Sequence, residues 1–474
     1  MTARAQAAAD PALLSATALV DAYGAGTLSP VTATEAVLAR VARLEPRLNA
    51  FCLVDREAAL EQAHASEARW KAGAPRGRLD GVPVSIKDIV MTRGWPTLRG
   101  SRTIDPAQPW ETDGPAVARL REDGAVLFGK TTTPEFAARP VTISPLTGVT
   151  RNPWDTTKTP GGSSGGAGAA VAAGLGPLAL GTDAGGSIRI PASLCGVFGH
   201  KPSGGRVPMF PPTPYATLAA FGPMSRTVAD AARMLTVIAR PDDRDSAALP
   251  ADGRDYEAAL EDGTPARWRV AFSPTLGHAD VDPEVAALVE AAVDRFAACG
   301  ARIARVETVF DDPVGLLARL KRGLTAYAFR NHGAEALAAM DPYLVAEIEA
   351  ARGAELFAHI DAEMERAAFA AGMARFHRDH DLLITPTLTV PAFAAEDDAP
   401  QGRGRYDWLA FTYPFNLTRQ PAASVPCGFT AAGLPVGLQI VGRFADDLTV
   451  LQAARVFETI APWADMRPNL ETET

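Results

Sequence analysis

The stretch TPGGSSGGAGAAVAAGLGPLALGTDAGGSIRIP, residues 159–191, contains two Gly-Gly-Ser turns on either side of an Ala-rich segment. Ser163 lies in the first turn and Ser187 in the second. A glycine turn can expose a serine hydroxyl and bring backbone N–H groups together around an oxyanion. The stretch therefore predicts a hydrolase in which one hydroxyl attacks a carbonyl and the other relays its proton.

A lysine upstream supplies the base that such a relay needs. The stretch GVPVSIKD, residues 81–88, alternates apolar and other residues, which predicts a strand with one face in the core and Lys87 on the other. A serine hydroxyl is a weak nucleophile until a base removes its proton. Lysine acts as that base only when burial lowers its pKa from about 10.4. Asp88 points away from Lys87 across the strand, so it is a poor candidate for keeping the lysine charged.

Each of these residues has an ordinary structural explanation when it is taken alone. A single lysine at the end of a strand is usually a solvated surface charge. Ser163 and Ser164 could form a turn that caps the next helix, and Ser187 could be a helix N-cap. The presence of all three features in one chain favours catalysis.

Two other motifs fit parts of the same stretch. Residues 161–165 satisfy G-x-S-x-G, the nucleophile elbow of α/β-hydrolases. That elbow follows an apolar strand, whereas DTTKTP precedes it here, at residues 155–160. A Gly-rich loop before a helix can also bind phosphate, but Ala167 and Gly168 stand where a P-loop requires Lys and Ser or Thr.

Three longer motifs resemble the amidase signature family. They are G-V-P-V-S-I-K-D at residues 81–88, P-G-G-S-S-G-G at 160–166 and G-T-D-x-G-G-S-I-R at 181–189. Shorter matches occur at residues 199–202, 222–227 and 433–442. The resemblance implies an amidase that cleaves a C–N bond through an acyl-enzyme, without a cofactor or a metal.

The resemblance also implies a role for individual residues. It makes Ser187 the nucleophile, Ser163 the bridging serine on a cis peptide bond, and Lys87 the base. It assigns the oxyanion hole to the backbone N–H groups of Ala184, Gly185, Gly186 and Ser187.

Three further residues are expected to support this set. Asp183 and Arg189 flank the second serine turn, where a salt bridge or hydrogen bonds to loop carbonyls could fix its geometry. Without the resemblance, a partly exposed ion pair of little energetic value would be an equal alternative. Ser164 is expected to hydrogen-bond within the relay instead of attacking.

Two aromatic-rich and nearly uncharged segments, residues 207–221 and 406–415, are plausible walls of a substrate pocket. Core packing is the alternative for either. The pocket residues predicted from them are Phe210, Tyr215, Phe221 and Tyr413. Arg419 is the cationic exception nearby, and it could bind a carboxylate or face solvent. We therefore expect neutral apolar or aryl amides to be preferred over glutamine, with aryl carbamates as a further substrate class.

Composition limits the remaining function classes. The chain has 474 residues, of which 47% are hydrophobic and 21% charged, so it can bury a large core. Its formal net charge of −9 argues against binding of nucleic acid. We expect a small-molecule amide-like substrate as the partner, no membrane, and a monomer or homodimer.

The cysteines and the N-terminus indicate a compartment. Cys52, Cys195, Cys299 and Cys427 lack C-x-x-C spacing, so we expect buried thiols in a reducing compartment and neither a zinc site nor a disulfide framework. The N-terminal stretch MTARAQAAADP lacks the apolar core of a signal peptide. We therefore expect a cytoplasmic protein.

Alternating helix and strand patterns predict an α/β fold, a large mixed central sheet with helices on both faces. We expect one large domain with an N-terminal helical region (1–80), a signature core (81–240), a mostly helical variable region (241–380) and a C-terminal part returning to the same sheet (381–474). The expected helices include residues 12–44 with a break at 24–30, 57–72, 227–239 and 448–460. The expected strands include residues 126–130, 178–181, 269–272, 382–385 and 434–441.

Three functions stay open at this point. The first is a standalone amidase, whose chemistry would extend to esters and carbamates (a urethanase activity). The second is the glutaminase-type subunit of a tRNA-dependent amidotransferase, which shares the same signature. The third is a catalytically silent binding protein, which the presence of Lys87, Ser163 and Ser187 disfavours.

Overall fold

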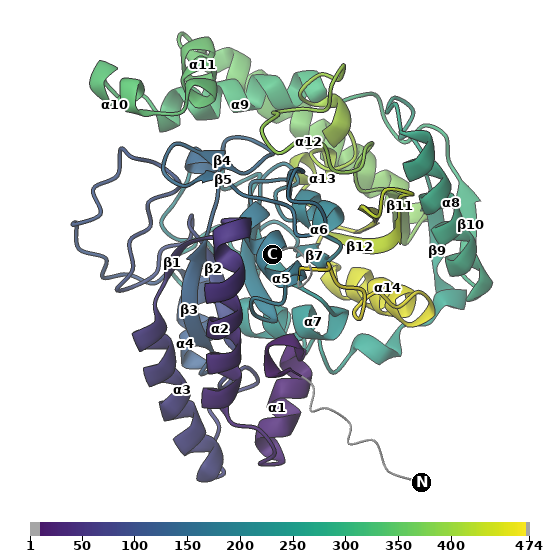
Figure 1. Cartoon of the computed structure of the whole chain (residues 1–474). Coiled ribbons are helices and arrows are strands. Elements are labelled where there is room, and N and C mark those ends of the chain that lie inside the picture. The colour runs from purple at the N-terminus through teal and green to yellow at the C-terminus, as the bar shows by residue number, and fades with distance from the viewer. Residues whose placement is uncertain (1–9, 471–474) are drawn as a thin grey trace.

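One mixed sheet of eleven strands runs through the centre of the molecule, and helices cover both of its faces (Figure 1). The computed structural model describes residues 10–470, so nearly all of the stretch MTARAQAAADP lies outside the described residues. The strand order is β1-β3-β2-β6-β8-β7-β12-β13-β11-β9-β10. This architecture confirms the predicted fold class.

The strands of this sheet are β1 (Phe51–Val54), β2 (Pro83–Lys87), β3 (Val126–Thr131), β6 (Leu178–Asp183), β7 (Phe198–Lys201), β8 (Ala220–Ser225), β9 (Arg269–Phe272), β10 (Arg302–Arg305), β11 (Leu382–Pro386), β12 (Ala422–Phe429) and β13 (Pro435–Gly442). A separate two-stranded sheet pairs β4 (Ile143–Ser144) with β5 (Gly148–Val149).

The helices are α1 (Ala16–Gly24), α2 (Pro30–Leu48), α3 (Arg56–Lys71), α4 (Pro115–Glu122), α5 (Gly165–Ala172), α6 (Arg189–Cys195), α7 (Val228–Ile238), α8 (Pro283–Ala298), α9 (Val314–Ala328), α10 (Ala334–Ala339), α11 (Pro342–Ala351), α12 (Leu356–Asp379), α13 (Pro414–Leu417) and α14 (Asp447–Ile460). The break expected between the first two long helices is present. The Ser29 side chain accepts the N–H of Thr32 at 3.1 Å and caps α2 ahead of Pro30.

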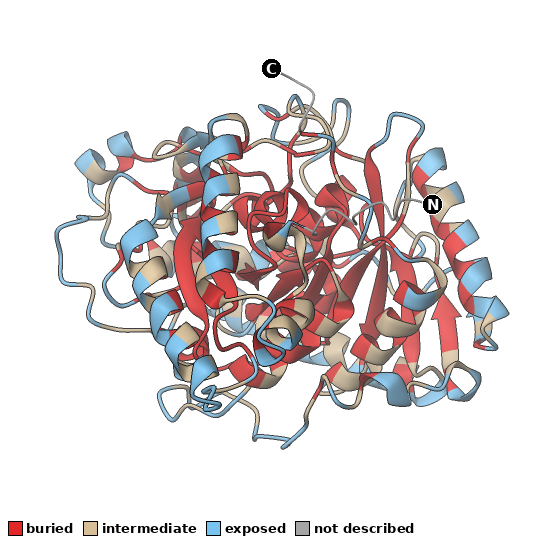
Figure 2. Ribbon diagram, turned by 60° about the horizontal axis from the view of Figure 1, so that its bottom comes forward, coloured by how far each residue is buried: buried red, intermediate tan, exposed pale blue. Residues whose placement is uncertain are grey.

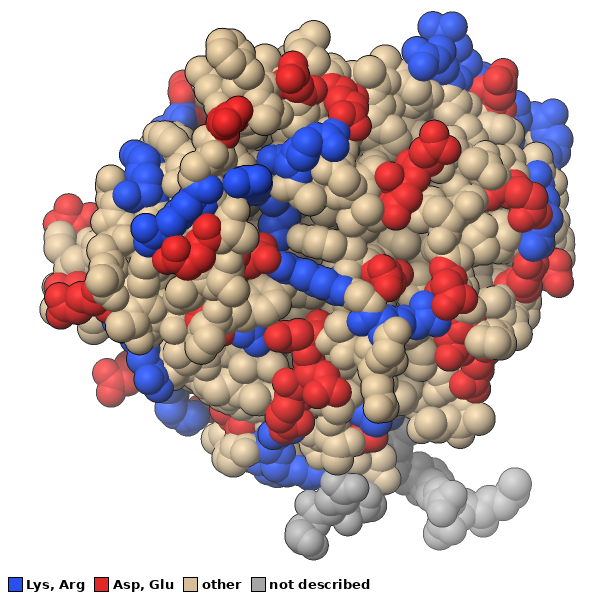
Figure 3. Space-filling model, turned by 90° about the horizontal axis from the view of Figure 1, so that it is seen from above, with Lys and Arg blue, Asp and Glu red and all other residues tan. Residues whose placement is uncertain are grey.

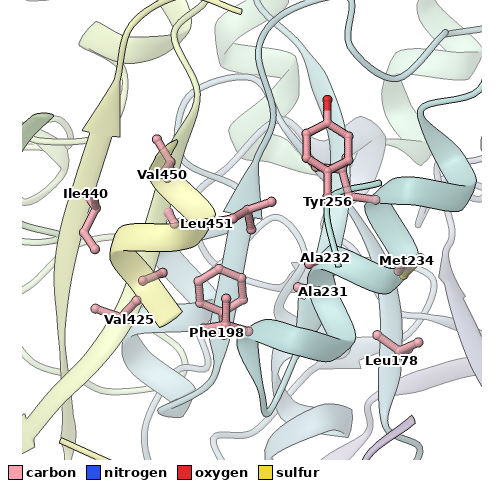
Figure 4. Packing of buried hydrophobic residues seen from close by; sticks show 14 of the residues in the cluster. Leu178, Phe198, Ala231, Ala232, Met234, Tyr256, Val425, Ile440, Val450 and Leu451 are labelled. Atoms are coloured by element: carbon pink, nitrogen blue, oxygen red, sulfur yellow. The ribbon is translucent and has the colours of Figure 1, made fainter. Parts of the chain in front are cut away.

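Burial separates the two faces of the sheet with the period of two that strands impose. Leu178 and Leu180 of β6 join a large apolar cluster that includes α7 and α14. Figure 4 shows part of this cluster, with Leu178 and Phe198 beside residues of both helices. Ala179, between the two leucines, packs instead into a cluster with α5 and α6. The sheet is therefore enclosed on both sides, as its buried centre in Figure 2 shows.

The prediction that β2 buries only one face is wrong. Every residue of β2 is buried, because β3 and β6 flank it in the sheet and helices pack above and below. Strands with parallel neighbours in such a position are usually covered on both faces. Lys87, the last residue of β2, is 0% exposed.

The structure corrects one further expectation and adds detail to two others. The prediction of buried thiols holds for Cys195 and Cys427, whereas Cys299 is half-buried and Cys52 is exposed on the edge strand β1. The variable region contains the strand β10, which the sequence pattern missed because its residues are mostly exposed at the sheet edge. Arg419, for which a bound carboxylate or solvent was the expected partner, donates to the carbonyl of Gly204 at 2.9 Å.

Among residues 10–470, no helix is long and apolar enough to cross a membrane.

Candidate active site

The two motif loops meet at the ends of two neighbouring strands. Lys87 ends β2, and Thr182 and Asp183 end β6, its parallel neighbour. Since parallel strands present their carboxyl ends at the same edge of a sheet, residues that follow them gather there. The first serine turn precedes α5, and the second connects β6 to α6.

Lys87 contacts two hydroxyl groups. Its Nζ lies 2.7 Å from Oγ of Ser163 and 2.9 Å from Oγ1 of Thr182. Burial lowers the pKa of Lys87 well below its ordinary value, and the charge of Asp183 opposes this only in part. Asp88 pairs with Lys130 at 3.1 Å and does not contact Lys87. These surroundings favour a neutral amine, which can accept a proton.

The first serine turn is fixed to β6 and to the second turn. The Gly162–Ser163 peptide bond is cis, as expected. The Oγ of Ser164 donates to the carbonyl of Thr182 at 3.1 Å and accepts its N–H at 3.3 Å. The N–H of Ser164 donates to the carbonyl of Ser187 at 3.1 Å. Ser164 therefore fixes Thr182, whose hydroxyl contacts Lys87, and it links the two serine loops.

The second serine turn leaves Ser187 half-buried, whereas Ser163 and Ser164 are almost completely buried. Gly186, just before it, has a φ of 128°, a conformation that favours glycine. A Cβ at this position would come within 2.5 Å of Oγ1 of Thr412. The turn therefore requires glycine beside the one serine of the site that is partly exposed.

A buried ion pair organises this turn. Asp183 and Arg189 are both fully buried and lie 3.0 Å apart. The carboxylate also accepts the N–H of Gly186 at 2.7 Å and of Ile188 at 3.2 Å. Although burial alone would raise the pKa of Asp183, the charge and the hydrogen bonds of the Arg189 guanidinium hold it well below its usual range. A carboxylate with so many donors fixes the backbone around Ser187.

Sequence reasoning missed several residues that complete this network. Arg189 donates to Oε1 of Gln439 at 2.7 Å and to Oδ1 of Asn416 at 2.7 Å. Asn416 in turn donates to the carbonyl of Asp183 at 3.0 Å, and Thr412 donates to the carbonyl of Gly185 at 2.8 Å. Gln439 lies in the motif at residues 433–442, which was a usable signal, whereas no motif marks Thr412 or Asn416.

The predicted pocket residues divide into two groups. Phe221 on β8 lies opposite Thr182 in the sheet, and the buried Tyr413 directly follows Thr412. Both are next to residues of the site.

The other two predicted pocket residues make contacts of a different kind. The hydroxyl of Tyr215 lies 2.8 Å from that of Thr325 on α9. Phe210 lies under the guanidinium of Arg244, whose carbon is 5.2 Å from the centroid of the ring.

An apolar cluster borders the second serine turn. Ala184 packs against it from the turn itself. The cluster includes Leu218 beside β8 and Leu320 on α9, together with Trp408 and Tyr413. The surroundings of the serines are thus charged and polar beneath the turn and apolar beside it.

Comparison with known proteins shows the family of the chain. The amidase family model matches residues 32–451. An acylamidase of Rhodococcus erythropolis is 38% identical over 476 residues, covering 96% of this chain and 97% of that protein. A glutamyl-tRNA(Gln) amidotransferase subunit of Myxococcus xanthus is 39% identical over 461 residues, covering 92% and 94%.

Solved structures give the same result. A bacterial aryl acylamidase of the amidase signature family superposes with a TM-score of 0.88 at 31% identity, covering 95% of this chain and 97% of that one. A 6-aminohexanoate cyclic dimer hydrolase superposes with a TM-score of 0.87 at 31% identity, covering 97% and 99%. Fold and site together define an amide hydrolase, and the chain belongs to the amidase signature family. It acts on small-molecule amides, at C–N bonds other than peptide bonds, which confirms the predicted enzyme class.

Proposed function

We propose that the chain hydrolyses amides through an acyl-enzyme on Ser187, with Ser163 and Lys87 as the proton relay. The Oγ of Ser187 attacks the amide carbon while its proton passes to Ser163, whose own proton passes to Nζ of Lys87. The protonated amine then returns a proton to the leaving nitrogen as the C–N bond breaks. Water, deprotonated by the same relay, releases the acid.

One observation supports this proposal most strongly. The Nζ of Lys87 lies 2.7 Å from Oγ of Ser163, and both side chains are buried away from water. A surface lysine would be protonated and hydrated, and it could not take up a proton. The partial exposure of Ser187 supports its role as the nucleophile, because the attacking hydroxyl must reach a substrate.

The backbone N–H groups of the same turn supply the proposed oxyanion hole. The resemblance assigns four N–H groups to it, but that of Gly186 donates to Asp183 at 2.7 Å. We therefore assign the developing negative charge to the N–H groups of Ala184, Gly185 and Ser187. The Asp183–Arg189 pair holds the turn in place so that these donors need not reorganise during the reaction.

The preferred substrate in this proposal is a neutral apolar or aryl amide, and the same chemistry extends to aryl carbamates. The apolar cluster that contacts Ala184 supports it, because pockets with apolar walls select apolar groups. The relatives named acylamidase and aryl acylamidase support it as well.

A glutaminase component of a tRNA-dependent amidotransferase is the second candidate. The amidotransferase relative from Myxococcus xanthus is as similar to this chain as the acylamidase is. The two candidates differ in substrate polarity and in the need for partner proteins.

A substrate comparison on the purified single chain tests the proposal. We expect kcat/KM to be highest for a 4-nitroanilide, lower for an aryl urethane and lowest for glutamine. A preference for glutamine would contradict the first candidate. Independently, a fluorophosphonate should add to Ser187, as intact-mass and peptide analysis would reveal, and addition to Ser163 would overturn the relay.

A further inference from the structure

The helix α12 carries an exposed apolar stripe. Its side chains Leu356, Phe357, Ile360 and Met364 are 68%, 78%, 44% and 67% exposed. They are four of the eight large hydrophobic side chains that are exposed among the described residues. An exposed apolar patch of this kind on a polar surface usually marks an interaction site.

The opposite side of α12 is already occupied. Ala362 and Phe369 pack into the apolar cluster beside the second serine turn, and Met373 packs into a neighbouring cluster. The stripe therefore lies on the outer side of a helix whose position in the molecule is fixed.

The stripe has the spacing of a helix-pairing seam. The residues at positions 357, 360, 364, 367, 371 and 374 are Phe, Ile, Met, Ala, Ala and Ala, and all six are exposed. Their separations alternate between three and four residues, which is the a/d pattern that brings two helices together along one line. In a surface helix without a partner, charged or polar residues usually occupy the solvent-facing positions, whereas these six positions carry none.

The order of side chains along the seam is self-complementary. The three large residues, Phe357, Ile360 and Met364, occupy the N-terminal half, and three alanines occupy the C-terminal half. When two copies of α12 pair antiparallel about a two-fold axis, each large side chain meets an alanine at the matching distance from the centre. Phe357 then faces Ala374 of the second copy, and every layer combines one large and one small residue. Two parallel copies would instead place large against large.

Charges beside the seam fit the same arrangement. Asp361 lies next to the large half and Arg375 next to the small half, both at flanking positions. Neither forms an ion pair within the part of the chain that the structure describes. Antiparallel pairing brings Asp361 of one copy towards Arg375 of the other on each side of the axis. Figure 3, which looks down on the end of the molecule that carries α9–α11, shows charges of both signs scattered over uncharged surface.

We propose that the chain forms a homodimer by antiparallel pairing of α12 through this seam. The seam from Phe357 to Ala374 is about 25 Å long at a rise of about 1.5 Å per residue. A single helix pair of that length buries less than the roughly 800 Å² per partner of a standard interface. The dimer should therefore dissociate on dilution.

Light scattering after size exclusion tests the dimer. We expect the purified chain to be dimeric at high micromolar concentration, and Ile360→Glu to be monomeric under the same conditions with an unchanged circular dichroism spectrum. The matched control is Met466→Glu, at an exposed methionine outside the helix, which should stay dimeric. A monomeric parent chain, or a dimer that Ile360→Glu leaves intact, would overturn the proposal.

Cross-linking tests the register without disturbing the fold. Phe357→Cys and Ala374→Cys are prepared separately, and each is treated with a short bis-maleimide alone and after mixing. We expect a cross-linked dimer above the parent background only in the mixture, because the two-fold axis puts position 357 opposite 374. Cross-linking of either variant alone, or of neither preparation, would contradict the antiparallel seam.

A charge exchange gives a second readout of the register. Asp361→Arg should weaken the dimer, and the double variant Asp361→Arg with Arg375→Asp should restore it to the parent dissociation constant. Failure of the double variant to recover would contradict the flanking pairs. Amide hydrolysis by the monomeric variants separates this inference from the proposed function, since the catalytic residues are not altered.

Discussion

Three lysines among residues 10–470 are buried near the centre of the sheet, and their neighbours decide which one can act as a base. Lys130 lies 3.1 Å from Asp88, so its proton is stabilised by a carboxylate. Lys201 donates to the carbonyls of Pro202 and Gln420, and burial lowers its pKa to about 7. Lys87 contacts two hydroxyls, one of which belongs to Ser163. Of the three, only a neutral Lys87 could accept a proton from a serine of the proposed relay.

Replacement of Ser187 by alanine should lower kcat by several orders of magnitude, because the acyl-enzyme can no longer form. Single-turnover and steady-state assays with an anilide measure this loss. Ser193→Ala, a buried serine on the following helix, serves as the control and should keep most of the activity. Retention of activity in Ser187→Ala would assign the attack to another group.

The pH dependence should reflect Lys87. Because its folded-state pKa lies below the ordinary value, activity should rise with pH as Lys87 loses its proton and fall towards acid as it gains one. Lys87→Met should abolish the reaction at every pH. Lys201→Met is the matched control: the acid limb of kcat/KM should persist in it, and disappearance of that limb would assign the titration to Lys201.

The proposed relay gives no histidine a role in the reaction. Replacing each of the seven histidines, His64, His200, His278, His332, His359, His377 and His380, by glutamine should leave kcat within a few-fold of the parent value. A folded single variant without activity, measured beside an active Lys87→Met, would show that the relay is assigned wrongly.

The short helix α13 and the strand β13 reach the serine turn from the far end of the sequence. Asn416 donates two hydrogen bonds to Asp183, and Gln439 accepts one from Arg189. Such contacts keep a loop in one conformation, because the buried side chains of Asp183, Arg189 and Asn416 all have hydrogen-bond partners.

Replacement of Asn416 by leucine should lower kcat by about 10- to 100-fold with a smaller change in KM, since the oxyanion donors lose their fixed position. It should also lower the free energy of unfolding by about 1–3 kcal/mol, because Asp183 and Arg189 lose buried partners. Gln420→Leu, a buried amide that donates to the carbonyl of Gly442, is the control. It should show a similar loss of stability in denaturant titrations without the loss of kcat.

At this scale the sequence predicted the central elements and missed the contacts between them. The strands β3, β6, β9, β11 and β13 and the helices α3, α7 and α14 lie where their apolar periodicity indicates. The serine turns and Lys87 could be located because motifs surround them. Thr412 and Asn416 could not, because an amide or hydroxyl on a short helix has no local pattern. Their partners are more than 200 residues away in the chain.

In the whole molecule, the helices α9–α12 lie at one end of the sheet, beside the serine loops (Figure 1). Two side chains of the loop before β8 attach to them: Tyr215 to Thr325 at 2.8 Å, and Thr217 to Arg366 on α12 at 2.9 Å. This loop leads to Leu218, a member of the apolar cluster that contacts Ala184.

Removing the first of these attachments should affect substrate binding more than chemistry. We expect Tyr215→Phe to raise KM for an aryl amide several-fold with little change in kcat, because the loop loses its hold on α9. Tyr23→Phe removes a hydroxyl that donates to the carbonyl of Gly81, away from the loop, and should leave KM unchanged. Equal effects of the two substitutions would contradict a role for the loop in binding.

The network that joins Arg189 to Gln439 also has a consequence for biosynthesis. A nascent chain from which β13 has not yet emerged already contains Lys87, Ser163 and Ser187, but the guanidinium at the base of the turn still lacks its glutamine partner. Chains are made from the N-terminus, and contacts between distant segments form last. We therefore expect hydrolytic activity to begin only after β13 has joined the sheet, and a chain truncated before β13 to be inactive in the anilide assay.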